Sequence, residues 1–269
     1  MSQLKRPLVQ STLLFGGLLF YILFMNTALV VWLRDNHLSL SLVQSIIIRQ
    51  VLSFGLPLGA YLAWKKLNLS DVVQLAPLSA KQTLLVVLIT LTALPVGMFV
   101  SGVTSLFFDN TAAQLLVPAA GRYELWWLLV AMAFTPALLE ELLFRGVLHH
   151  LLTGLSVSVI VVISGLFFGL VHLNIQQFSY AFLLGMLFSV MVQYTGSVWS
   201  GVLAHLLVNG LNVVLVYLQA RGLALASESE LAQQLTPTAE SLGPLLVVGV
   251  IALLALPCLQ WLLARLKVA

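Results

Sequence analysis

The sequence predicts an all-α, polytopic integral membrane protein with about eight transmembrane helices, and two observations lead to this fold class. Of its 269 residues, 61% are hydrophobic and 8% are charged, with a mean hydropathy of +1.07. Soluble domains carry about 25% charged residues. The apolar residues also lie in long unbroken runs, unlike the alternating pattern of a transmembrane barrel. Composition therefore excludes a sizeable soluble domain.

Eight apolar runs are expected to cross the bilayer, and no internal repeat divides them, so we treat residues 1–269 as a single transmembrane domain. The first run follows two basic residues but is too long for the apolar part of a signal peptide, so we interpret it as a retained anchor. The polar stretch 220–242 is expected to be a loop. The runs cover residues 12–33, 42–64, 82–108, 125–151, 156–173, 178–195, 198–219 and 243–264.

The distribution of basic residues predicts that both termini are cytoplasmic. With the N-terminus inside, seven basic residues face the cytoplasm and three the outside, the bias that membrane insertion favours. The net charge of +3 thus reflects orientation in a membrane, expected to be a bacterial plasma membrane, and not nucleic-acid binding. The inner residues are Lys5, Arg6, Lys65, Lys66, Lys81, Arg265 and Lys267, and the outer ones are Arg34, Arg122 and Arg221.

Four charged residues fall inside apolar runs. Three of them lie in the run 125–151, within the six consecutive residues 140–145. Charged groups at the bilayer centre cost at least about 2.5–3.5 kcal/mol each on insertion scales, so they are candidates for function. Glu141 and Arg145 are four residues apart, the spacing of a helical ion pair. Glu140 points about 100° away from Glu141 and has no partner in its own helix. The fourth residue, Arg49, is expected to snorkel or to pair with a carboxylate.

The lone carboxylate of Glu140 suits a general base, because its oxygens are free to accept a proton from water. The alternative is that the three charges of this run only pack between helices. Pro136, one turn earlier, lacks a backbone N–H and is expected to bend the helix.

Two further runs carry polar residues at helical spacing. Phe168 lies one turn before His172 and is expected to pack beneath the imidazole. In the seventh run, His205 and Asn209 share a helix face. A single histidine in a membrane helix more often forms an interhelical hydrogen bond, but these residues together with Glu140 form the set that hydrolysis needs. Gly165 and Gly169 form a strip on which another helix can approach closely.

In their order, the motifs Glu140-Glu141-x-x-x-Arg145, Phe168-x-x-x-His172 and His205-x-x-x-Asn209 resemble the CAAX prenyl protease type II and bacteriocin-processing family of intramembrane proteases, also called the Abi family. The resemblance covers about residues 125–210, which we treat as the motif-bearing catalytic core. It implies an integral-membrane endopeptidase whose partners are the lipid bilayer and a membrane-associated peptide or protein substrate.

The resemblance also implies a role for each motif residue. Glu140 would activate water, with His172 helping to hold it, and His205 and Asn209 would donate hydrogen bonds to the tetrahedral oxyanion. Glu141, Arg145 and Phe168 would support these groups.

A zinc mechanism within the same family would instead use Glu140, His172 and His205 as metal ligands and would need a separate base. Glu141 is the candidate for that base, yet its spacing ties it to Arg145, so we favour catalysis without a cofactor. Cys258 is the only cysteine, which excludes a cysteine-based zinc site. A transporter and a silent scaffold are the other function classes. No inverted repeat of the kind found in transporters is evident.

Helix geometry predicts that the three candidate residues lie at different depths. At about 1.5 Å per residue from the cytoplasmic ends, Glu140 would lie about 16 Å deep, His205 about 10 Å and His172 about 24 Å. Straight, parallel helices would not bring them together, so a tilt, a misplaced helix start or the bend at Pro136 is required.

Overall fold

The computed structural model describes residues 2–222, 242–267 and 269, and it is helical over most of these ranges. Within them, seven helices are long and apolar enough to cross a membrane, which confirms the polytopic all-α class. They are Leu8–Asp35, Leu42–Lys65, Ala80–Ser105, Leu125–Leu151, Ile175–Thr195, Val198–Ala220 and Leu242–Lys267. The predicted loop 220–242 lies outside the described residues apart from its ends.

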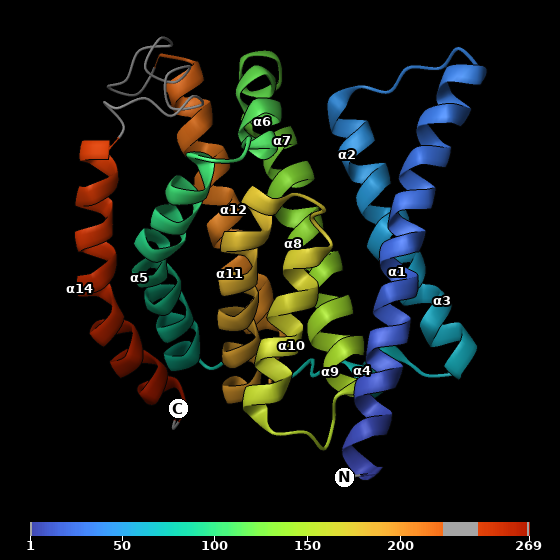
Figure 1. The fold of residues 1–269 in the computed structure, drawn as a ribbon, viewed down its shortest axis with the longest axis vertical. Helices are drawn as coiled ribbons and strands as arrows, with labels where there is room; N and C mark the ends of the chain where they lie inside the picture. The colour runs from blue at the N-terminus through green and yellow to red at the C-terminus, as the bar shows by residue number, and fades with distance from the viewer. Residues whose placement is uncertain (1, 223–241, 268) are drawn as a thin grey trace.

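The helices are labelled as in Figure 1, and several spans contain more than one element. The first half of the chain forms α1 (Ser2–Asp35), α2 (Leu42–Gln50), η1 (Val51–Gly55), α3 (Leu56–Lys65), α4 (Leu69–Val72), α5 (Ala80–Ser105) and α6 (Thr111–Arg122). The fourth span joins α7 (Leu125–Leu129), η2 (Val130–Phe134), α8 (Thr135–Glu141), η3 (Leu142–Leu148) and α9 (His149–Leu151). The last helices are α10 (Val157–Leu170), α11 (Ile175–Thr195), α12 (Val198–Ala220) and α14 (Leu242–Lys267).

Helix α10 is shorter than the predicted run 156–173. Its 14 residues extend about 21 Å at 1.5 Å per residue, less than the roughly 30 Å thickness of the hydrocarbon layer. The chain then reverses in a turn, where Leu173 takes a positive φ of 53°. In Figure 1 this turn lies well short of the level at which α12 and α1 end. His172 therefore lies in a turn at the end of α10 and not inside a helix.

Side-chain caps explain where several helices begin. Ser41 and Ser79 each accept a hydrogen bond from the backbone N–H of a glutamine three residues later, and that glutamine side chain accepts one from the serine N–H. These reciprocal bonds satisfy donors that the first turn of a helix leaves free. Asn174 caps α11 by accepting from the N–H of Gln177 at 2.9 Å. The cap lets α11 start directly after the α10–α11 turn.

The second and fourth spans contain π-helical turns, which widen the helix. In the fourth span, η2 and η3 lie on either side of α8, which carries Glu140 and Glu141. Directly before Thr135 and Pro136 lies η2, whose last turn is closed by the bond from Thr135 N–H to the carbonyl of Val130. Such turns often occur at functional sites.

The motif-bearing helices α8, α10, α11 and α12 lie between two groups of outer helices (Figure 1). Helices α1 to α3 lie on one side of them, and α5 and α14 on the other. The predicted glycine strip is confirmed, because α10 and α11 approach closely along it. A Cβ atom on Gly165 would lie 2.8 Å from the carbonyl oxygen of Phe182, and one on Gly169 would lie 3.2 Å from that of Phe178.

Candidate active site

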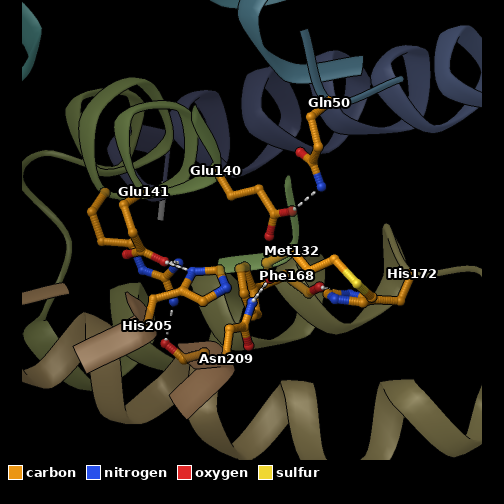
Figure 2. Close-up of polar contacts among 10 residues, drawn as sticks. Gln50, Met132, Glu140, Glu141, Phe168, His172, His205 and Asn209 are labelled. Atoms are coloured by element: carbon orange, nitrogen blue, oxygen red, sulfur yellow. Dashed lines mark hydrogen bonds and ion pairs between the residues drawn. The ribbon is translucent and has the colours of Figure 1, made fainter. Parts of the chain in front are cut away.

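The four predicted catalytic side chains line one cavity of about 330 Å³. Glu140 comes from α8, His172 from the α10–α11 turn, and His205 and Asn209 from α12. Figure 2 shows these side chains converging from three parts of the chain. The structure thus brings together residues up to 69 positions apart, from Glu140 to Asn209.

Glu140 is buried, with 4% of its surface exposed, and one of its carboxylate oxygens has a partner from another span. Its Oε1 atom accepts a hydrogen bond of 3.0 Å from Nε2 of Gln50 (Figure 2). Within the described residues, Oε2 has no hydrogen-bond partner. Gln50 was missed by the sequence reasoning. A polar glutamine directly after Ile46-Ile47-Ile48-Arg49, inside an apolar run, was the sequence feature that could have indicated it.

Glu141 has a different environment and does not line the cavity. Its Oε1 atom accepts a hydrogen bond of 2.7 Å from Nη1 of Arg145, which confirms the predicted ion pair. The same oxygen lies 3.0 Å from Nδ1 of His205, a contact that helical spacing does not predict. Arg145 also donates to the carbonyl of Gly185 at 2.8 Å, and its guanidinium lies 4.6 Å from the ring centre of Phe168. Glu141 therefore connects the buried arginine to the cavity imidazole.

The partners of the two histidines define which ring nitrogen carries a proton. Nδ1 of His172 lies 2.8 Å from the carbonyl oxygen of Phe168, and Nδ1 of His205 contacts the carboxylate of Glu141. A carbonyl and an ionised carboxylate can only accept hydrogen bonds, so each Nδ1 is assigned the proton. In a neutral imidazole, Nε2 is then an acceptor. His205 can donate through Nε2 only when both ring nitrogens are protonated.

Phe168 holds the two imidazoles in place. Its ring contacts His172 edge to face at 5.4 Å, the packing predicted from their spacing, and contacts His205 at 5.5 Å. The ring of His205 also stacks against the ring of Phe188, with 5.4 Å between the ring centres. These aromatic contacts limit ring rotation on both histidines.

Asn209 binds the carbonyl group of Met132, which lies four residues before Pro136 in the π-helical element η2. Pro136 has no N–H to donate to the carbonyl of Met132, four residues earlier. The side chain Nδ2 of Asn209 donates to this oxygen at 3.2 Å (Figure 2). An amide nitrogen carries two hydrogens, so one remains for a ligand in the cavity.

The predicted difference in depth is reduced by the direction of the side chains. The Cα–Cβ bonds of a helix lean toward its N-terminus. Because the fourth span and α10 run in opposite directions, Glu140 leans toward the α10–α11 turn that carries His172. The bond from His172 to the carbonyl of Phe168 folds its imidazole back along α10.

The three side chains of the zinc alternative, Glu140, His172 and His205, all line the cavity. Among the described residues, no group of three or more His, Cys, Asp or Glu side chains is placed to hold a metal ion. The two histidines and Glu140 share the cavity, but Phe168 lies between the imidazole rings.

The fold and the cavity together define an integral membrane protein in which a buried carboxylate and two imidazoles line one cavity. Residues 122–211 match the family model described as type II CAAX prenyl endopeptidase Rce1-like. This match to about a third of the chain confirms the resemblance, predicted from the ordered motifs, to the CAAX prenyl protease type II and bacteriocin-processing family. The family implies intramembrane protease activity. Neither the curated proteins nor the solved structures contain a match to the chain.

Proposed function

We propose that the protein is an intramembrane endopeptidase that hydrolyses a peptide bond of a membrane-associated protein or peptide with water activated by Glu140. The observation that carries this proposal is the cavity itself. One carboxylate oxygen of Glu140 has no partner among the described residues, and the carboxylate shares the cavity with His172, His205 and Asn209. This set provides a base and hydrogen-bond donors in a protected site.

In the proposed mechanism, Glu140 takes a proton from a water molecule, and the resulting hydroxide attacks the carbonyl carbon of the peptide bond. Nε2 of neutral His172 accepts the second hydrogen of the water and thereby orients it. Glu140 then passes its proton to the leaving amine, which restores the carboxylate when the C–N bond breaks. Gln50 holds the other carboxylate oxygen at 3.0 Å and keeps the side chain aimed into the cavity.

The oxyanion receives hydrogen bonds from Asn209 and His205. His205 would donate through Nε2, because its Nδ1 atom is directed to Glu141. The carboxylate of Glu141 accepts the hydrogen bond from Nδ1 of His205 and so holds the ring with Nε2 directed away from Glu141. Glu141 and Arg145 therefore act through His205 and do not touch the water.

We also propose that this reaction requires no metal. If zinc were required in another arrangement, Glu140, His172 and His205 would have to move to become its ligands. A chelator separates the two mechanisms, since it removes activity only from a zinc enzyme.

The proposal is tested by incubating the purified full-length protein in a neutral detergent with a defined mixture of apolar peptides and identifying products by mass spectrometry. Glu140→Gln should abolish all cleavage that the wild type shows, with and without chelator. Glu124→Gln, the same change at an exposed position before α7, is the matched control and should cleave normally. Cleavage that survives Glu140→Gln would refute the role of this residue. Activity lost with chelator and restored by zinc would favour the zinc mechanism.

A further inference from the structure

Arg49 is a membrane-embedded cation whose charge is not neutralised by the described part of the chain. It lies near the end of α2 and is half-buried. Its Nε atom donates to the hydroxyl of Ser45 and its Nη1 atom to the side-chain oxygen of Asn26, each at 3.3 Å. Both partners are neutral, and no carboxylate of the described residues forms an ion pair with Arg49. The predicted pairing with a carboxylate is therefore not realised within the described chain.

Arg49 lines a second cavity that adjoins the catalytic one. This cavity of about 420 Å³ lies between α1, the second span and the α10–α11 turn. It shares with the catalytic cavity the residues Ile46, Gln50, Phe54, Val171 and His172. A ligand in the catalytic cavity can therefore continue past Gln50 and His172 toward Arg49.

We propose that Arg49 binds a carboxylate of the peptide substrate, an inference that rests on the proposed function. An uncompensated cation inside a membrane protein favours an anionic ligand, and the planar guanidinium matches the two oxygens of a carboxylate. Nη2 of Arg49 makes no hydrogen bond to the described residues and is free to bind.

The geometry limits where this carboxylate lies in the substrate. Arg49 and Gln50 are neighbours in the chain, with Cα atoms about 3.8 Å apart, and Gln50 touches Glu140. Even with both side chains extended, the guanidinium lies within about five residues of the cleaved bond, at about 3.3 Å per residue of extended peptide. A free C-terminal carboxylate is the source we favour. An acidic side chain has the same chemistry and is separated by experiment.

The test measures binding of a peptide to the full-length Glu140→Gln protein in a neutral detergent by fluorescence anisotropy. The probe is an apolar decapeptide with an N-terminal fluorophore, made with either a C-terminal carboxylate or a C-terminal carboxamide. We expect the acid to bind about tenfold more tightly than the amide. Adding Arg49→Gln should reduce the acid-to-amide ratio of binding affinities to about one. Adding Arg49→Lys should retain part of the preference for the acid.

Arg34→Gln in the same background is the matched control, because Arg34 is an exposed arginine at the outer end of α1. It should leave the acid-to-amide ratio unchanged. A carboxamide peptide with an internal glutamate tests the acidic side chain, and binding of this peptide in preference to the acid would overturn the assignment to the C-terminus. The carboxylate and carboxamide peptides can be compared on the Glu140→Gln protein without any substitution at Arg49. The test therefore remains valid if an Arg49 variant does not fold.

Equal binding of acid and amide would overturn the proposal. Binding of phosphatidylglycerol that depends on Arg49, without discrimination between the peptides, would assign the site to a lipid phosphate and would also overturn it. If the wild type cleaves the peptides without discriminating acid from amide, the carboxylate site fails and the proposed function stands. If Glu140→Gln binds the acid through Arg49 while the wild type cleaves nothing, the proposed function fails and the carboxylate site stands.

Discussion

Replacing Gly201 by alanine should displace Glu141 and thereby misplace His205. Gly201 lies in α12, and an added Cβ would lie 2.6 Å from Oε2 of Glu141 and 3.2 Å from Cγ2 of Val192. A normal C···O contact is about 3.3–3.6 Å, so the carboxylate must move by about 0.7–1 Å. A shift of this size is comparable to one that costs about 100-fold in rate when it misplaces a catalytic group.

The stability effect of Gly201→Ala combines two opposite terms. Alanine improves helix propensity by about 1 kcal/mol, while overpacking of a rigid core costs about 1–3 kcal/mol. We expect a net loss of stability of up to about 2 kcal/mol and a 10- to 100-fold loss of turnover. Thermal unfolding in detergent and peptide cleavage measure the two effects on the same sample.

Gly210→Ala is the matched control on the same helix. Its added Cβ would lie 3.9 Å from Leu129 and 4.0 Å from Ala133, which is ordinary contact distance. This variant should unfold at a slightly higher temperature and keep its turnover. Normal turnover in Gly201→Ala would refute the reasoning, since it would mean that the position of Glu141 does not matter for catalysis.

Three further predictions follow from the site and the topology. Glu141→Gln or Arg145→Gln alone should each cost about 3–5 kcal/mol, because each strands a buried charge, and unfolding of the double variant should show strong non-additivity. The double variant should nevertheless stay inactive, because His205 loses its carboxylate; normal turnover would argue against that role. Asn209→Ala should lower turnover about 10²- to 10³-fold in the peptide assay, and a smaller effect would argue against an oxyanion donor. Reporter fusions at the C-terminus and near residue 230 should report opposite compartments, and a shared compartment would contradict the eight-span topology.

Contacts within one helix could be predicted from the sequence because the period of a helix determines which residues are neighbours. The ion pair between Glu141 and Arg145 and the contact of Phe168 with His172 both join residues four positions apart. Hydropathy likewise predicted the spans, since burial in lipid requires long apolar runs. Close approach of another helix to Gly165 followed from its small size.

Contacts between distant spans could not be predicted, because they depend on how the helices are arranged around one another. Gln50 and Glu140 are 90 positions apart, and Glu141 and His205 are 64 apart. The π-helical turns that set the direction of these side chains leave no simple periodic signal. The early end of α10 was also hidden, since the apolar run continues through Val171 into the turn.

The short α10 has a consequence for how the membrane itself takes part. Non-helical backbone at membrane depth is tolerated only where protein or water surrounds it, and the α10–α11 turn lies beside both cavities. Helix α10 is about 9 Å shorter than a 30 Å hydrocarbon layer, and a short apolar helix favours local thinning of the bilayer beside it. Thinning of this kind would shorten the path of water to the proposed hydrolytic site, so that a substrate would remain in the plane of the membrane while water reaches it.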